Sequence, residues 1–170
     1  MTASINHVVL PGTYDPVTLG HLDVIRRAAR LFPKVTVGVA ASRGKRGVGT
    51  TFSLQERVDM LEEALVEEGI EGVEVQSFEG LLVDFCKRIG AGGVVKGLRA
   101  MTDFEYELAQ AGLNSHLDPD LESVFVMASA EHGYLSSSIV RELASLGSSV
   151  EGLVPVCVER RLAERYASEQ

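Results

Sequence analysis

The 170-residue sequence contains 16 Lys and Arg against 24 Asp and Glu, a formal net charge of −8 at pH 7. This balance argues against a general nucleic-acid surface, because such proteins present a basic excess to the phosphate backbone. The composition is 45% hydrophobic and 24% charged, with no apolar run of membrane-spanning length and no charged-then-apolar leader. We therefore expect one cytoplasmic domain over residues 1–170, without a membrane partner and with a local basic pocket for any anionic ligand.

Five short β-rich runs alternate with segments that have helical periodicity. The expected strands are residues 5–10, 34–41, 73–78, 93–97 and 123–129. The expected helices are residues 18–32, 53–68, 81–89, 102–115, 137–146 and 156–166. This alternation predicts an α/β fold, a single Rossmann-like domain in which a five-stranded parallel sheet carries helices on both faces. Ligands then bind at the carboxyl ends of the strands.

Local signals support several helix starts. Ser53 with Glu56, and Thr102 with Glu105, have the spacing of a capping box. Pro155 precedes the last helix, where proline is favoured. These signals predict helices that begin close to residues 54, 103 and 156.

The two cysteines, Cys86 and Cys157, lie far apart and outside any CxxC or Cys/His ligand spacing. Buried thiols are therefore favoured over a disulfide or a redox pair, and no zinc site is indicated.

The segment "PGTYDPVTLGH", residues 11–21, connects the first strand to the first helix. Thr18 is placed to cap that helix, so Gly20 and His21 fall in its first turn, where free N–H groups and the helix dipole attract anions. An imidazole there can donate a hydrogen bond to a phosphate oxygen. The alternative is a histidine that only caps or packs at a helix start. Asp15 is suited to hold the turn by an Asx-type bond before Pro16.

The segment "SRGKRGVGTT", residues 42–51, is the one Gly-rich, basic connection in the chain. Its composition predicts a mobile loop.

Three motifs together resemble the phosphopantetheine adenylyltransferases, bacterial enzymes of the nucleotidyltransferase superfamily. "TLGH" fits the superfamily's (His/Thr)-x-Gly-His motif, while "KGLRAMTDFEYE" and "YLSSSIVRE" follow the fourth and fifth strands. The resemblance covers residues 8–162. It implies transfer of the adenylyl group of ATP to 4′-phosphopantetheine, a homohexamer, Mg²⁺ dependence and feedback inhibition by coenzyme A.

The resemblance also implies roles for individual residues, with His21 stabilising the transition state. It assigns to phosphopantetheine Thr13, Lys45, Leu82 and Lys96. It assigns to ATP Thr13, Tyr14, His21, Gly97, Leu98, Arg99, Glu107, Gly133, Tyr134, Leu135, Ser136, Ser137, Ser138 and Ile139, with Arg141 as an additional pyrophosphate contact. For Glu107 the alternative is a solvated helix carboxylate, and for the serine run it is simple N-capping.

The chemistry agrees with this assignment. The nucleophile is the acceptor's own phosphate, so the reaction needs positioned anions and preorganised positive donors rather than an activated serine or cysteine. No acidic cluster has metal-ligand spacing, so we expect no metal site built from protein side chains and Mg²⁺ carried by the phosphates of ATP.

The chain departs from the family pattern in places. "KGLR" stands where "RGLR" is usual, which keeps the charge of Lys96 but replaces a planar fork with a point charge. The basic loop is longer than usual, which leaves open whether Lys45 or Arg46 contacts the substrate. Two other functions also remain open: a relative that uses nicotinate mononucleotide or glycerol phosphate as acceptor, and a non-catalytic nucleotide-binding module.

Overall fold

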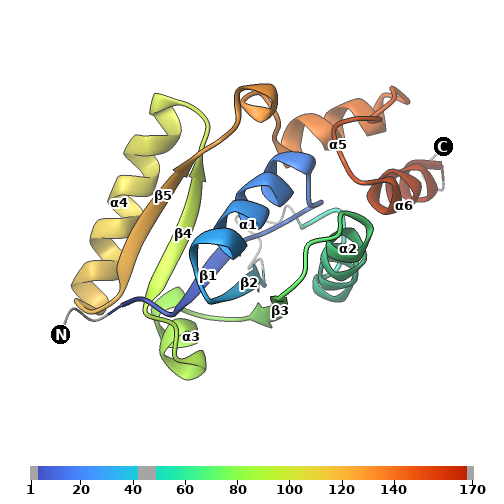
Figure 1. The fold of residues 1–170 in the computed structure, drawn as a ribbon. Helices are drawn as coiled ribbons and strands as arrows, with labels where there is room; N and C mark the ends of the chain where they lie inside the picture. Colours follow the sequence, from blue (N-terminus) through green and yellow to red (C-terminus); the bar gives the residue numbers. More distant parts are fainter. Residues whose placement is uncertain (1–3, 42–48, 168–170) are drawn as a thin grey trace.

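The computed structural model describes residues 4–41 and 49–167. Five parallel strands form one sheet in the order β3-β2-β1-β4-β5 (Figure 1). Their bounds are β1 His7–Gly12, β2 Lys34–Ala40, β3 Val73–Phe78, β4 Gly93–Leu98 and β5 Glu122–Met127. The predicted α/β class, with a five-stranded parallel sheet and helices on both faces, is therefore confirmed.

Within residues 4–41 and 49–167, six α-helices connect or follow the strands. Their bounds are α1 Leu19–Leu31, α2 Leu54–Glu67, α3 Leu82–Ile89, α4 Met101–Leu117, α5 Ser137–Ser145 and α6 Val156–Ala167. A short 3-10 helix, η2 (Ala130–His132), precedes α5 and was not predicted. Among the helices of the described residues, none is both long enough and apolar enough to span a bilayer.

The apolar side chains of the strands divide between two core clusters, one on each face of the sheet. Val8 and Leu10 of β1 pack in the larger cluster with residues of α1, α2, α5 and α6. Val9 points to the opposite face, where the smaller cluster includes Phe85 and Cys86 of α3. This alternation follows from the period-2 geometry of a strand. Cys86 and Cys157 are both buried free thiols, as predicted, and burial raises the pKa of each.

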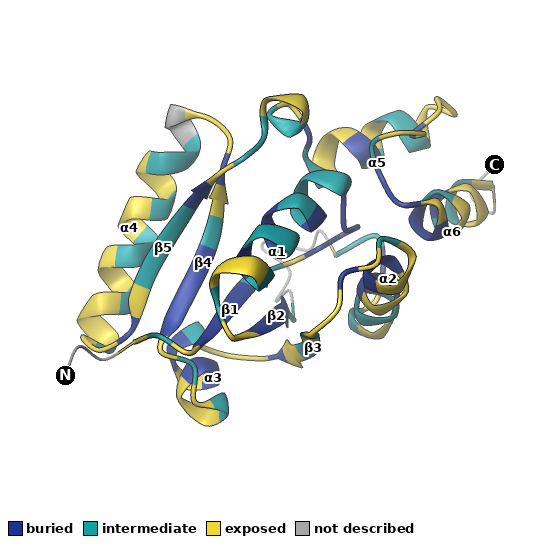
Figure 2. Ribbon diagram, in the orientation of Figure 1, coloured by how far each residue is buried: buried dark blue, intermediate teal, exposed yellow. Residues whose placement is uncertain are grey.

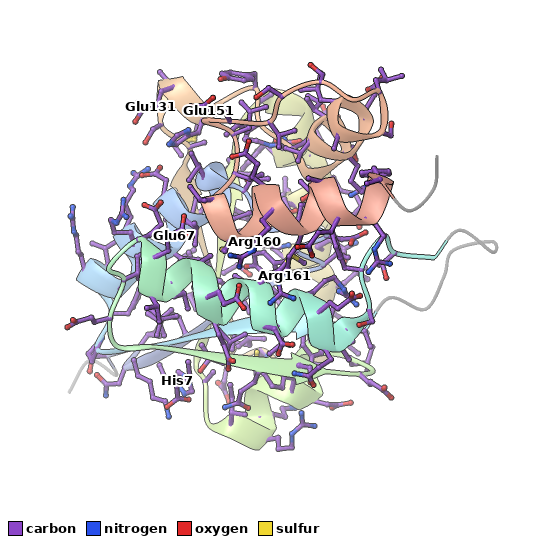
Figure 3. The ribbon with its side chains drawn as sticks, turned by 90° about the vertical axis from the view of Figure 1, so that its right-hand side faces the viewer. His7, Glu67, Glu131, Glu151, Arg160 and Arg161 are labelled. Atoms are coloured by element: carbon purple, nitrogen blue, oxygen red, sulfur yellow. The ribbon has the colours of Figure 1, made fainter. Side chains whose placement is uncertain are left out.

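Hydrogen bonds to backbone N–H groups fix the starts of several helices. The capping box of Ser53 and Glu56 is present at α2, as predicted. Helix α6 lies along α2 (Figure 3), and the Glu67 carboxylate of α2 accepts from the N–H groups of Val156 and Cys157 at 2.7 and 3.0 Å. The Glu67 carboxylate thus pairs free N–H groups at the start of α6 and ties the two helices together.

The capping box predicted for Thr102 and Glu105 is wrong. Helix α4 begins at Met101 with Ala100 as its N-cap residue, and no side chain caps it there. Instead, the Asp103 carboxylate accepts from the backbone N–H of Arg99 at 3.3 Å. The carboxylate that accepts from a backbone N–H before the helix therefore belongs to Asp103, two residues before the predicted Glu105.

The strand order reverses between β1 and β4, which makes this boundary the topological switch point of the sheet. Across the boundary, β1 and β4 pair only where Val8 faces Gly93 and Val9 faces Val94. Because the pairing stops there, the carboxyl halves of the two strands leave a crevice between them.

Candidate active site

A pocket of about 280 Å³ opens at this crevice. The ends of β1 and β4 form its floor, and α1, α4, η2 and the start of α5 contribute further lining residues. Figure 1 shows where these elements lie in the fold. The lining residues used below are Gly12, Tyr14, Thr18, His21, Lys96, Gly97, Arg99, Asp103, Glu107, His132, Leu135, Ser136 and Ser137.

His21 is fixed by the N-terminal cap of α1. Its Nδ1 accepts the backbone N–H of Thr18 at 3.0 Å, while the Thr18 Oγ1 accepts the backbone N–H of His21 at 3.3 Å. Because Nδ1 is an acceptor, the proton of the neutral ring is on Nε2. His21 therefore does take part in the cap of α1, as the alternative interpretation of the sequence held. This role leaves its Nε2–H available to a ligand.

The surroundings of His21 keep it neutral. Burial lowers its pKa to about 4, and the nearby cations Arg99 and Lys96 act in the same direction. The Tyr14 ring meets the imidazole edge-on, with 5.1 Å between ring centroids. Near neutral pH, His21 is thus a hydrogen-bond donor without a net charge.

The turn after β1 folds back tightly over the strand. Tyr14 has a φ of 50°, unusual for a residue other than glycine, and its hydroxyl donates to the Leu10 carbonyl at 3.0 Å. A Cβ at Gly12 would lie 2.9 Å from the Tyr14 ring, so no larger residue fits there without displacing the ring. At the end of β4, a Cβ at Gly97 would similarly lie 2.9 Å from a methyl group of Val24 on α1. Both glycines allow the close packing that forms the pocket floor.

Two cations at the end of β4 are paired with carboxylates of α4. Lys96 Nζ lies 3.5 Å from Glu107 Oε1, and Arg99 Nε lies 3.2 Å from Asp103 Oδ2. Arg99 also donates through Nη1 to the Leu135 carbonyl, next to the start of α5. These pairs are partly exposed, so an incoming anion can compete with the carboxylates for both cations.

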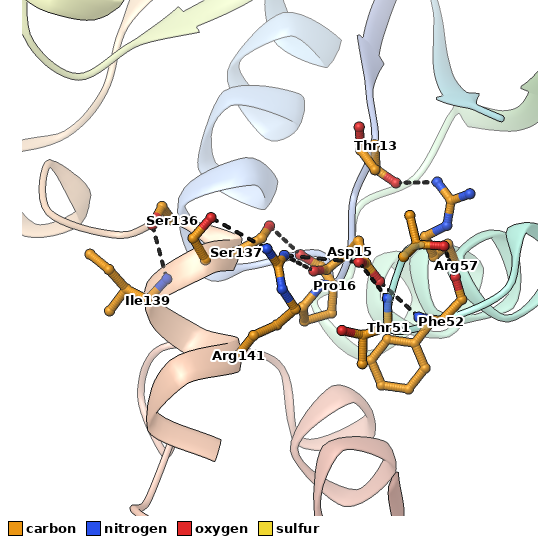
Figure 4. Close-up of polar contacts among 12 residues, drawn as sticks. Thr13, Asp15, Pro16, Thr51, Phe52, Arg57, Ser136, Ser137, Ile139 and Arg141 are labelled. Atoms are coloured by element: carbon orange, nitrogen blue, oxygen red, sulfur yellow. Dashed lines mark hydrogen bonds and ion pairs between the residues drawn. The ribbon is translucent and has the colours of Figure 1, made fainter. Parts of the chain in front are cut away.

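The three serines at the start of α5 have different contacts. Ser136 is the N-cap residue and accepts the N–H of Ile139 at 3.2 Å. The Ser137 hydroxyl donates to the Pro16 carbonyl at 2.7 Å, which ties α5 to the turn after β1 (Figure 4). Arg141 Nη2 lies 3.4 Å from the Ser138 hydroxyl. Capping therefore accounts for one serine only, and Ser136 and Ser137 both line the pocket.

The Asx-type bond predicted for Asp15 is wrong. The buried Asp15 carboxylate accepts instead from the backbone N–H groups of Thr51 and Phe52, at 2.8 and 2.9 Å (Figure 4). Arg141 Nη1 donates to the Asp15 backbone carbonyl. Asp15 thus joins the turn to a distant segment before α2, a partner that local sequence rules do not reveal.

Most of the predicted nucleotide contacts meet at the pocket. The predicted residues that line it are Tyr14, His21, Lys96, Gly97, Arg99, Glu107, Leu135, Ser136 and Ser137. The predicted residues outside its lining are Thr13, Leu82, Leu98, Gly133, Tyr134, Ser138, Ile139 and Arg141. Lys45 and Arg46 lie outside the described residues.

Two side chains with polar groups in the lining, Asp103 and His132, were not singled out from the sequence. Asp103 lies in the motif "KGLRAMTDFEYE", four residues after Arg99. This i,i+4 spacing is a signal for the ion pair between the two side chains. His132 belongs to η2, for which no sequence signal was recognised.

Comparisons with known proteins agree with this geometry. The cytidylyltransferase-like family matches residues 9–143. Phosphopantetheine adenylyltransferases from Moorella thermoacetica and Caldanaerobacter subterraneus subsp. tengcongensis are 53% and 45% identical over 158 residues, which are 93% of this chain and 96% of each relative. A solved structure of a candidate nicotinate-nucleotide adenylyltransferase from Vibrio parahaemolyticus superposes with a TM-score of 0.70 at 15% identity, covering 98% of both chains.

The chain therefore belongs to the cytidylyltransferase-like nucleotidyltransferases, and its pocket lies at the switch point of its parallel sheet. Within this class, its identity to the curated relatives over nearly their whole length makes it a member of the phosphopantetheine adenylyltransferase family.

Proposed function

We propose that this enzyme transfers the adenylyl group of ATP to 4′-phosphopantetheine, giving dephospho-coenzyme A and pyrophosphate. An oxygen of the acceptor phosphate attacks the α-phosphorus of ATP, and the bond from this phosphorus to the oxygen bridging to the β-phosphorus breaks. The attacking group is already an anion, so the step needs no general base.

The observation that carries the proposal is the state of His21. Its Nδ1 is held by Thr18 and its pKa is lowered, so the ring offers an Nε2–H donor beside two cations. Such a donor stabilises negative charge as it develops on the transferred phosphoryl group. A module that only bound nucleotide would not require a donor placed for this purpose.

Lys96 and Arg99 are proposed to exchange their carboxylate partners for substrate phosphates. Lys96 takes the acceptor phosphate, as the resemblance implies, while Arg99 and the start of α5 take the phosphates of ATP. The helix N-terminus at Ser137 supports this division, because its free N–H groups and dipole favour an anion. Glu107, freed from Lys96, is proposed to accept from the nucleotide.

Mg²⁺ is proposed to enter with ATP. In the part of the chain that the structure describes, no three His, Cys, Asp or Glu side chains are grouped as a metal site. The ion would neutralise charge on the phosphates, with water completing its coordination. The chain's own contribution is then to hold and orient the two anions.

Assembly and regulation belong to the same proposal. Helix α4 exposes Tyr106, Leu108, Leu113 and Leu117, with exposed fractions between 48% and 59%. Apolar side chains gathered on one helix support self-association, and the family resemblance favours a homohexamer. Feedback inhibition by coenzyme A and a cytoplasmic location are proposed on the same resemblance, since the product is a direct precursor of coenzyme A.

The test is release of pyrophosphate from ATP, measured with no acceptor and with phosphopantetheine, nicotinate mononucleotide or glycerol 3-phosphate in turn. We expect turnover with phosphopantetheine alone. Turnover with another acceptor would assign the enzyme to a different transferase activity, and ATP binding without turnover would contradict catalysis.

A further inference from the structure

Arg57 is a buried arginine outside the pocket that contacts the turn after β1, next to residues that line the pocket. It lies in the first turns of α2, and only 2% of its surface is exposed. Its Nη1 donates to the Thr13 carbonyl at 2.6 Å and to the Ala40 carbonyl at 2.9 Å (Figure 4 shows the first). One guanidinium thus joins the carboxyl ends of two neighbouring strands, β1 and β2.

A hydrogen bond to the Thr13 carbonyl can influence the pocket, because both neighbours of Thr13 line it. Thr13 lies between Gly12 and Tyr14, and both of these line the pocket. Tyr14 has the unusual φ of 50° and packs edge-on against the His21 ring. A shift of the Thr13 peptide would therefore move residues that touch the reacting region, although Arg57 does not line the pocket.

A second contact from the same part of the chain reinforces the first. The N–H groups of Thr51 and Phe52, just before the Ser53 cap of α2, donate to the Asp15 carboxylate. Together with Arg57, they fix the turn to the start of α2 at both Thr13 and Asp15. Two residues of α5 hold the same turn from another side. The Ser137 hydroxyl donates to the Pro16 carbonyl, and Arg141 donates to the Asp15 carbonyl.

Stability alone does not explain a charged group at this position. Burial lowers the pKa of Arg57, with Asp15 partly offsetting the effect. Among the described residues, its Nε is buried without a hydrogen-bond acceptor. A well-packed apolar side chain is often no worse for stability than a buried charge. The guanidinium instead provides a rigid donor that reaches two carbonyls at once.

We infer that Arg57 is a positioning residue for the transfer reaction: it holds the Thr13 peptide, and through it the turn that contacts His21, in the geometry the transition state requires. This inference rests on the proposed function. Misplacement of reacting groups by about 1 Å is enough to lower a rate about 100-fold, so the contact has its main effect on kcat rather than on ATP binding.

The test compares Arg57→Met and Arg57→Lys with the control Arg26→Met. Arg26 also donates to a backbone carbonyl, that of Glu68 at 3.1 Å, but at the opposite end of α2 and away from the pocket. For each protein, kcat and both KM values are measured by pyrophosphate release, with the folded fraction taken from circular dichroism and thermal unfolding.

We expect kcat per folded enzyme to fall about 100-fold in Arg57→Met and about tenfold in Arg57→Lys, whose ammonium keeps the charge but is not held at the position of Nη1 by a planar guanidinium. The KM for ATP should change far less, and Arg26→Met should keep the wild-type kcat even where its Tm falls.

A wild-type kcat in both Arg57 variants would overturn the inference, as would a loss confined to Tm. If Arg57→Met does not fold, Arg57→Lys decides alone, and failure of both to fold would make Arg57 a residue of fold stability only. An inactive wild type would instead contradict the proposed function itself.

Discussion

Helices α1 and α4 reach the pocket from opposite faces of the sheet, and they differ in how firmly they are held (Figure 2). Helix α1 buries Leu22, Val24, Ile25 and Ala28 and begins with a complete capping box. None of the described side chains of α4 is buried, and four of its large apolar residues are exposed. The two helices therefore have very different support from the core.

This difference separates two kinds of site residue. His21 on α1 is fixed by the helix that carries it, and its donor is in place before substrate binds. Lys96 and Arg99 are paired with carboxylates of the weakly packed α4, so the proposed substrate contacts require these pairs to rearrange. Substitution of His21 on α1 should thus lower mainly kcat, whereas substitutions in the ion pairs between β4 and α4 should change mainly substrate affinity.

The largest expected effect is that of His21→Ala on kcat, a decrease of roughly 10²- to 10³-fold. The loss is mainly catalytic because the hydrogen bond strengthens as charge builds on the transferred group, whereas bound ATP keeps its other phosphate contacts. Steady-state kinetics and calorimetry of ATP binding separate the two. His116→Ala, at the far end of α4, is the control, and an unchanged kcat in His21→Ala would exclude the proposed role.

Lys96→Ala should lower kcat/KM for phosphopantetheine about ten- to a hundredfold, because it removes a charge-assisted contact worth roughly 1.5 to 3 kcal/mol. ATP binding should change much less, and Lys96→Arg should keep most of the activity. Lys87→Ala is a matched control, since Lys87 pairs with Asp118 away from the pocket. An equal loss of ATP affinity in Lys96→Ala would move this residue to the nucleotide side.

Thr18→Val tests whether the cap of α1 prepares His21. It removes the hydroxyl that accepts from the His21 N–H, so we expect the free energy of unfolding to fall by about 0.5 to 2 kcal/mol. The kcat should fall less than in His21→Ala, because the Thr18 backbone N–H still holds Nδ1. Thr18→Ser, which keeps the hydroxyl, should have a free energy of unfolding and a kcat close to those of the wild type. Thermal unfolding and kinetics measure them, and a kcat loss in Thr18→Val as large as that of His21→Ala would contradict this ranking.

The smallest expected effect is that of Glu107→Gln. The substitution removes the ionic partner of Lys96 while keeping an oxygen acceptor, so the KM for phosphopantetheine should fall about two- to fivefold, as expected for a pair worth up to about 1 kcal/mol. The KM for ATP should rise slightly. Initial rates at varied phosphopantetheine and saturating ATP measure the effect. A higher KM for phosphopantetheine would mean that Glu107 helps to place the acceptor rather than competing for Lys96.

The sequence predicted local features well and long-range contacts poorly. Thr18 as the cap of α1 and His21 in its first turn followed from residue type and spacing, because an N-terminal cap is made within a few residues. The partner of Asp15 could not be predicted, because Thr51 and Phe52 are 36 and 37 residues away along the chain. The two carbonyls that accept from Arg57, those of Thr13 and Ala40, likewise come within its reach only after β1, β2 and α2 pack together.

The start of α4 illustrates another limit. Thr102 and Glu105 matched the spacing of a capping box, yet the helix begins at Met101. Spacing alone does not fix the phase of a helix start when the preceding strand and the Arg99–Asp103 pair determine where the chain turns. The motif after β4 indicated residues that line the pocket, but it did not indicate that Glu107 and Asp103 pair with its two cations.

His21 is a neutral hydrogen-bond donor that is held in place before substrate binds. Its pKa is lowered to about 4 in the folded protein from about 6.5 in an unfolded chain, so only the unfolded chain takes up a proton between these values. The stabilisation that comes from neutral His21 is therefore complete above pH 6.5 and is lost as the pH falls toward 4.

The most direct test is an NMR titration of the His21 ring nitrogens in the substrate-free enzyme, with the resonances assigned by comparison with His21→Gln. We predict a neutral ring protonated on Nε2 from pH 8 to about 5.5, with a midpoint near 4. A midpoint near 6.5, or a neutral ring protonated on Nδ1, would contradict the account.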